Sequence, residues 1–206
     1  MTPPPRAGEQ GRKERAMIEL AYVIPAYNAE RTVLATVEAV LGQRGARVHV
    51  VVVDDGSTDG TADAARSTRD WRVEVVRQRN LGLAGARNTG LEVLEDRAKA
   101  VCFLDADDTV EREHAAALCG ALGIGGGGGP SAGFDAAACG VRMVGAGLED
   151  LGWTVDVLDG DLAPERLIGL NPLAVGAVGL RVEALRERGG ERPFVASQGT
   201  EDWGLW

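Results

Sequence analysis

The stretch that decides the fold is Val101-Cys102-Phe103-Leu104-Asp105-Ala106-Asp107-Asp108, in which a run of apolar residues leads directly into a group of carboxylates. The apolar run predicts a strand buried on both faces. One interpretation of the carboxylates is that they cap the next helix, where Asp is favoured. The other is a metal site, because Asp105 and Asp107 are two residues apart and their side chains point the same way in an extended segment. Taken alone, the stretch supports either interpretation.

Length and composition limit the class of protein. A chain of 206 residues suits one domain with a substantial core. The net charge of −9 argues against nucleic acid as a partner, because binding a phosphate backbone needs a basic surface. The three widely spaced cysteines favour neither a disulfide framework nor a zinc site, and with two histidines a His-based site is poorly supported. His49, inside an apolar run, is interpreted as a packed strand residue.

The location of the protein is predicted from what the sequence lacks. It has no run of about 18 apolar residues, the length needed to cross a bilayer, and no signal-peptide pattern. We therefore expect a soluble, cytoplasmic protein. Peripheral attachment to a membrane and assembly into a homo-oligomer are left open.

Strand-like and helix-like segments alternate along the first half of the chain. Residues 1–16, rich in Pro, Gly and charge, are predicted to be a disordered tail. Strands are expected at 18–24, 48–53, 73–76 and 101–104, with helices at 29–43 and 61–69 between the first three. Between the last two, a glycine-bearing loop at 80–88 is expected to run into a helix that ends at Leu94. This alternation predicts an α/β fold with a doubly wound, mostly parallel sheet and right-handed crossovers.

The pattern weakens after residue 110. A helix is expected at 111–122, a strand at 136–144, and a strand followed by a helix within 176–187. The glycine-rich segment 123–133 is predicted to be a flexible loop. It is not interpreted as a phosphate-binding loop, because it lacks the Lys-Ser/Thr pair and does not follow a strand.

Polar clusters follow the predicted strands where these end. They are Pro25-Ala26-Tyr27-Asn28, Asp54-Asp55-Gly56-Ser57 and Asp105-Ala106-Asp107-Asp108. In an open parallel sheet, ligands bind beyond the carboxyl ends of the strands, so the clusters are expected to meet at one edge. Tyr27 could stack on a nucleobase and the carboxylates could bind a ribose, while packing and helix capping remain the alternatives. The absence of Gly-x-Gly-x-x-Gly after the first strand argues against NAD or FAD.

Four segments together resemble the family-2 glycosyltransferases of the GT-A fold. They are Ile24–Asn28, Val53–Thr61, Asn80–Gly90 and Phe103–Asp108, whose order and spacing match through residue 110. The resemblance implies one GT-A domain over residues 17–206, a Rossmann-like nucleotide-binding half at 17–110 and an acceptor half at 111–206. It implies that the domain is a metal-dependent, inverting enzyme that transfers a sugar from a nucleotide sugar, expected to be UDP-linked.

The resemblance also assigns roles to individual residues. The implied nucleotide-sugar pocket consists of Pro25, Ala26, Tyr27, Glu30, Asp54, Asp55, Arg87, Asp105, Ala106 and Asp107. Within it, Asp54 and Asp55 would hold the base and ribose, and Arg87 would lie near the diphosphate unless it is only a helix-surface arginine. In the Asp-x-Asp (DXD) pattern, Asp107 would bind Mn²⁺ or Mg²⁺, and Asp105 would complete the metal site through a metal-bound water or contact the ribose. Asp108 is expected to cap the next helix.

The C-terminal segment Glu201–Trp206 resembles the acceptor-side motif of the same family. Asp202 would act as the general base on a hydroxyl of the acceptor, which is expected to be a saccharide, a lipid-linked sugar or a small molecule. Gly204 departs from the family pattern, and the chain stops at Trp206, so we expect either a truncated chain or an incomplete catalyst. Two other hypotheses stay open: a sugar nucleotidyltransferase, and a catalytically degenerate domain that only binds sugar nucleotides.

Overall fold

The structure is a computed structural model that describes residues 17–94, 96–125, 134–144, 149–155 and 175–189. The predicted tail at 1–16, most of the predicted glycine-rich loop and the segment that contains Asp202 lie outside the described residues.

The centre of the molecule is a six-stranded sheet with the strand order β3-β2-β1-β4-β8-β5. Its strands are β1 (Ile18–Ala26), β2 (Val48–Asp54), β3 (Val73–Arg77), β4 (Ala98–Phe103), β5 (Ala136–Ala138) and β8 (Val178–Arg181). Strands β1 to β4 pair in parallel, and β8 runs antiparallel to both β4 and β5. The prediction of a mostly parallel α/β sheet is therefore confirmed.

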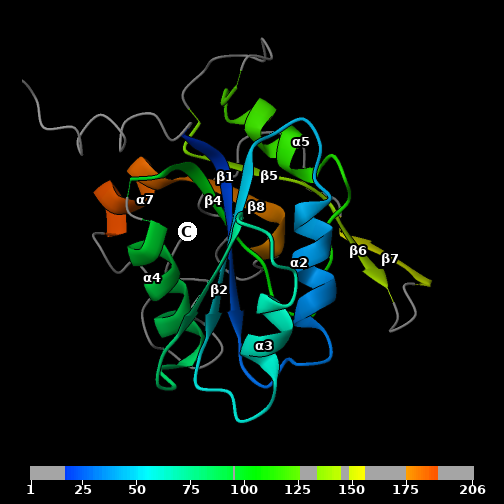
Figure 1. The fold of residues 1–206 in the computed structure, drawn as a ribbon. Coiled ribbons are helices and arrows are strands. Elements are labelled where there is room, and N and C mark those ends of the chain that lie inside the picture. The colour runs from blue at the N-terminus through cyan, green and yellow to red at the C-terminus, as the bar shows by residue number, and fades with distance from the viewer. Residues whose placement is uncertain (1–16, 95, 126–133, 145–148, 156–174, 190–206) are drawn as a thin grey trace, which may run out of the picture.

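Helices cover both faces of this sheet (Figure 1). The helices are α2 (Val33–Leu41), α3 (Thr61–Arg66), α4 (Gly82–Leu94), α5 (His114–Ala121) and α7 (Val182–Gly189), and a short 3₁₀ turn, η1 (Val175–Ala177), precedes β8. Alternate residues of β1 divide between the two cores: Tyr22 and Ile24 pack with α2, α3 and α5, while Val23 packs with α4 and α7. The predicted doubly wound arrangement is confirmed.

Helix α4 packs very closely on β1. A Cβ atom added at Gly90 would lie 2.2 Å from Cγ1 of Val23, closer than packed atoms approach. Glycine at position 90 thus brings the helix backbone down onto the sheet. The close approach also lowers Arg87, one helical turn earlier, toward the carboxyl end of the sheet, where it is buried.

Several predicted boundaries are wrong. Strand β1 continues through Pro25 to Ala26, helix α4 already begins at Gly82 where a loop was expected, and α5 begins at His114 and not at residue 111. Helix α2 begins at Val33 and not at residue 29, because the backbone N–H groups of Asn28, Ala29 and Glu30 donate hydrogen bonds to side chains of the loop after β2. The strand expected at 136–144 is two strands in different sheets. Strand β5 joins the central sheet, and β6 (Val141–Val144) pairs with β7 (Asp150–Val155) in a separate two-stranded sheet.

Among the described residues, no helix is both long and apolar enough to cross a membrane.

Candidate functional site

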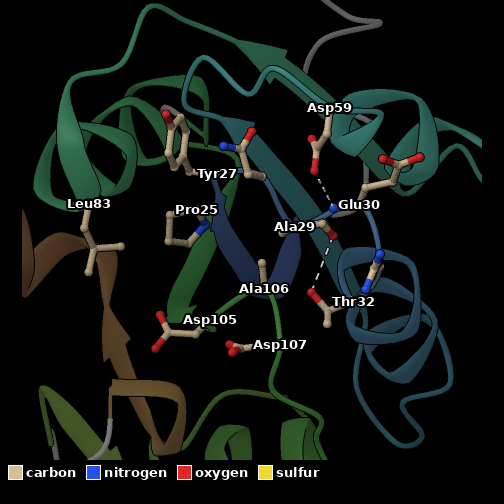
Figure 2. A pocket seen from close by; sticks show the side chains of 12 residues that line it. Pro25, Tyr27, Ala29, Glu30, Thr32, Asp59, Leu83, Asp105, Ala106 and Asp107 are labelled. Atoms are coloured by element: carbon tan, nitrogen blue, oxygen red, sulfur yellow. Dashed lines mark hydrogen bonds between the residues drawn. The ribbon is translucent and has the colours of Figure 1, made fainter.

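A cavity of about 750 Å³ lies at the carboxyl ends of β1 and β4. Strands β2 and β3 lie on one side of β1 and β4 lies on the other, so the cavity is at the point where the strand order reverses. Its lining residues are Pro25, Tyr27, Asn28, Ala29, Glu30, Arg31, Thr32, Asp59, Leu83, Asp105, Ala106 and Asp107 (Figure 2). Of the three predicted clusters, the one after the first strand and the one after residue 104 line this cavity together, whereas Asp54 and Asp55 of the third cluster do not line it.

The aromatic and the acidic groups lie on different sides of this cavity. Figure 2 shows Tyr27 on one side and Asp105 and Asp107 on the other, with Pro25 and Ala106 between them. The Tyr27 side chain is 54% exposed and presents its ring to solvent. The cavity can therefore accommodate a flat ring at one end and a positively charged group at the other.

The loop after β1 is fixed against the loop after β2. Asn28 adopts a left-handed backbone conformation (φ 51°), and its Oδ1 accepts a hydrogen bond from Thr58 N at 2.9 Å. Gly60 N donates to Glu30 Oε2, and Glu30 N donates to Asp59 Oδ2. A hydrogen bond from the Thr61 hydroxyl lowers the pKa of Asp59, which keeps this acceptor ionised. Glu30 thus lines the cavity, and its position is set by these bonds.

Arg87 contacts the acidic segment, residues 105–108, from inside the protein. Its side chain is 1% exposed, and its Nη2 lies 3.5 Å from Oδ1 of Asp105, whose side chain is 52% exposed. The alternative that Arg87 is a helix-surface residue is therefore wrong. Arg87 does not line the cavity described above; it holds Asp105, which does.

The prediction that Asp108 caps the next helix is wrong. Helix α5 starts only at His114, its N-cap residue is Glu113, and no side-chain hydrogen bond caps it. Asp108 N instead closes a turn onto Asp105 O at 3.1 Å. Loss of solvation and the negative charges of Asp105 and Asp107 raise the pKa of Asp108 to about 6. The acidic segment is thus a place of concentrated negative charge.

Asp54 and Asp55 are buried and hold the neighbouring loops. Asp54 accepts from Ser57 N at 2.9 Å and pairs with Nε of Arg77 at 3.3 Å. Asp55 Oδ1 accepts from Gln78 Nε2 at 2.7 Å and from Leu81 N at 2.8 Å. Neither caps α3, because Asp59 accepts the bond from Thr61 N at the start of that helix. Their role toward a base and ribose stays a prediction.

The carboxylates at the cavity fit a hard divalent cation. Asp105 and Asp107 both line the cavity, and their oxygens are the ligand type that Mg²⁺ and Mn²⁺ prefer. In the described part of the chain, no group of three or more His, Cys, Asp or Glu residues could hold a metal. Two carboxylates suit a cation whose other ligands are water and phosphate oxygens.

Sequence reasoning missed several residues that line or support the cavity. Arg31, Thr32, Asp59 and Leu83 belong to this group, and Thr36 lies behind the cavity. The signal for Leu83 was present, because it lies inside the segment Asn80–Gly90 that carried the family resemblance. No pattern along the sequence indicates the contact of Thr36, which joins residues far apart in the chain.

Fold and cavity define the class of the molecule as a doubly wound α/β protein with a ligand site at the switch point of its sheet. The chain belongs to glycosyl transferase family 2, whose sequence profile matches residues 22–127, about half of its length.

Three similar proteins illustrate the relationship. The succinoglycan biosynthesis protein ExoO of Rhizobium meliloti is 42% identical over 97 residues, which cover 47% of this chain and 27% of ExoO. The Escherichia coli enzyme WfaP, a UDP-Glc:alpha-D-GlcNAc-diphosphoundecaprenol beta-1,3-glucosyltransferase, is 37% identical over 90 residues, which cover 43% of this chain and 35% of WfaP. The chain thus spans about a third or less of these relatives.

The third similarity is structural. The mannosyltransferase PcManGT from Pyrobaculum calidifontis, solved in complex with GDP-Man and Mn²⁺, superimposes with a TM-score of 0.61 at 20% identity. The superposition covers 91% of this chain and 50% of PcManGT. It shows that the two proteins share the GT-A fold.

Proposed function

We propose that this chain binds a nucleotide sugar in the cavity between Tyr27 and Asp107 and transfers the sugar to a hydroxyl acceptor. The observation that carries the proposal is the meeting of two groups at one cavity: an exposed aromatic ring after β1 and a pair of carboxylates after β4. A nucleotide sugar with a divalent cation suits both groups, because its flat base can lie on the ring and the cation can join its diphosphate to the carboxylates.

In this proposal the base lies beside Tyr27 and the diphosphate lies near Asp105 and Asp107. These two carboxylates would hold a Mn²⁺ or Mg²⁺ ion, and Arg87 fixes the orientation of Asp105. When bound, such a cation neutralises negative charge on the nucleoside diphosphate leaving group. Two similar proteins support the kind of donor, since WfaP is named for the donor UDP-Glc and PcManGT was solved with GDP-Man and Mn²⁺. We propose a UDP-linked donor.

The acceptor side of the proposal rests on Asp202. Its carboxylate would take the proton from the acceptor hydroxyl while the hydroxyl oxygen bonds to the anomeric carbon and the bond to the diphosphate breaks. Attack from the face opposite the leaving group inverts the anomeric centre. The acceptor is proposed to be a saccharide, a lipid-linked sugar or a small molecule.

The proposal is tested by incubating the protein with Mn²⁺, a panel of UDP-sugars and candidate hydroxyl acceptors, and by measuring the UDP released. We expect UDP release from at least one donor, and we expect Asp202→Asn to lower transfer by about 10²-fold or more while UDP still binds. Unchanged transfer by Asp202→Asn would contradict its role as the base. Consumption of a nucleoside triphosphate with release of pyrophosphate would favour a nucleotidyltransferase, and binding without any release would favour a degenerate binding domain.

A further inference from the structure

Helix α2 makes a buried hydrogen bond to the backbone of the acidic segment. Thr36 is 1% exposed, and its Oγ1 donates to the carbonyl oxygen of Ala106 at 3.0 Å. Ala106 stands between Asp105 and Asp107, so this bond holds the acidic segment at the residue between its two cavity-lining carboxylates.

The residues just after α2 bind the chain between the acidic segment and α5. Just beyond α2, Gln43 Nε2 donates to Glu111 O at 2.7 Å, and Gln43 Oε1 accepts from Ala115 N at 2.8 Å. Arg44 N donates to Arg112 O at 2.8 Å. The segment from Asp105 to α5 is therefore attached at both of its ends. Its start is bonded to α2, and its end is bonded to the residues that follow α2. Thr36 supplies the attachment that lies at the carboxylates.

A hydrogen bond at this carbonyl restricts the backbone that carries the Asp107 side chain. The carbonyl of Ala106 belongs to the planar peptide that joins Ala106 to Asp107. When its oxygen is held, the peptide cannot rotate freely, and the Cα atom from which the Asp107 side chain extends keeps its position. The buried side chain of Ala106 limits movement of the same peptide. Both constraints leave Asp105 and Asp107 directed at the cavity (Figure 2).

We propose that Thr36 is a positioning residue, which orients Asp105 and Asp107 for a divalent cation without touching the cation itself. This inference rests on the proposed function, because it requires that the two carboxylates bind a metal. Groups that orient metal ligands from behind typically change metal affinity by about 10–100-fold when they are removed. Thr36 meets the requirements of such a group, since it is buried, rigid at χ1 and bonded to the ligand-bearing backbone.

The test compares Mn²⁺ binding by the wild-type protein and by Thr36→Val, measured by calorimetry in the presence of UDP. Valine keeps the shape of threonine and removes only the hydroxyl. We expect the dissociation constant for Mn²⁺ to rise by roughly tenfold in Thr36→Val and to return close to the wild-type value in Thr36→Ser, which restores the hydroxyl. Thr68→Val is the matched control, because it removes a bond from a threonine hydroxyl to the Ala65 carbonyl that lies outside the cavity lining.

Different results would overturn different claims. If the wild-type protein binds no Mn²⁺ with UDP, the proposed function fails and this inference fails with it. If the wild type binds Mn²⁺ and Thr36→Val binds it equally well, only the positioning role fails. The same holds if Thr68→Val weakens Mn²⁺ binding as much as Thr36→Val, because the effect would then follow from stability. Should Thr36→Val not fold, Thr36→Ala and Thr36→Ser differ only by the hydroxyl, and equal Mn²⁺ affinities of those two would overturn the inference.

Discussion

Arg87 and Asp105 form an ion pair whose two members differ greatly in exposure. The guanidinium is almost fully buried, whereas half of the Asp105 side chain reaches solvent. Removing Asp105 and removing Arg87 should therefore lower the free energy of unfolding by different amounts. A carboxylate that loses its partner can stay hydrated, but a buried guanidinium that loses a carboxylate cannot recover the interaction from water.

We predict that Asp105→Asn lowers the free energy of unfolding more than Arg87→Met does, with a difference of about 1–3 kcal/mol. The methionine fills much of the volume of the arginine and needs no counter-charge. Urea unfolding of the two variants and the wild type measures the difference. A larger loss for Arg87→Met would mean that packing of the arginine, and not its charge, dominates the pair.

His114 is a second residue whose surroundings should change the stability of the protein, here as a function of pH. Its Nδ1 lies 2.7 Å from the hydroxyl of Tyr22, and burial lowers the pKa of His114. The unfolded chain, in which histidine has its usual pKa of about 6.5, therefore takes up a proton more readily than the folded protein does. The stabilising contribution of neutral His114 is present above the unfolded pKa and is lost as the pH falls below it.

We predict that the free energy of unfolding of the wild type decreases from pH 7 toward pH 5 by up to about 1.4 kcal/mol per pH unit more than that of His114→Gln. His49 is present in both proteins, so its own titration cancels in the comparison. Urea unfolding at a series of pH values measures the difference. Parallel pH profiles of the two proteins would contradict the prediction.

At the scale of elements, the contact of α4 with β1 decides how deeply Arg87 is buried. The missing side chain of Gly90 allows this contact, since a Cβ atom there would overlap Val23. The helix α5 offers a matched comparison, because a Cβ atom at Gly120 would meet nothing within 4 Å.

We predict that Gly90→Ala lowers the free energy of unfolding by about 1–3 kcal/mol, because the added methyl overpacks the contact between helix and sheet. Gly120→Ala should instead raise the stability by about 0.5–1 kcal/mol, since alanine favours the helix and the space is open. Thermal or urea unfolding of both variants tests the pair. Equal effects of the two substitutions would contradict the close packing of α4 on β1.

The elements that the sequence predicts well are those whose residues carry a local pattern. Strand β2 is buried along its whole length, and its continuous run of β-branched residues predicts this burial. The start of α2 was predicted too early, because the residues after Pro25 bond to the loop after β2, and periodicity does not register such contacts. The break between β5 and β6 depends in the same way on pairing with distant strands.

At the scale of the whole molecule, the rule for parallel sheets predicts that the polar clusters after β1, β2 and β4 meet at one edge, and the clusters after β1 and β4 do line one cavity. The hydrogen bonds that hold the residues at that edge in place could not be predicted, because they join residues far apart in the sequence, as Thr36 and Ala106 are. The burial of Arg87 is of the same kind, since it follows from the approach of α4 to β1. The sequence thus predicts which functional side chains lie at the cavity, whereas the orientation and burial of those side chains follow only from the folded chain.

The central claim is that the cavity binds a nucleoside diphosphate together with a divalent cation held by Asp107. Calorimetric titration of UDP into the protein, with Mn²⁺ and with EDTA, tests it most directly for the wild type, Asp107→Asn and Asp63→Asn. Asp63 is the matched control, because its side chain is 92% exposed on α3 and its substitution changes the net charge equally. We predict that Mn²⁺ strengthens UDP binding by roughly tenfold or more in the wild type and Asp63→Asn but not in Asp107→Asn. Equal UDP affinity with Mn²⁺ and with EDTA in the wild type, or an unchanged effect of Mn²⁺ in Asp107→Asn, would contradict the claim.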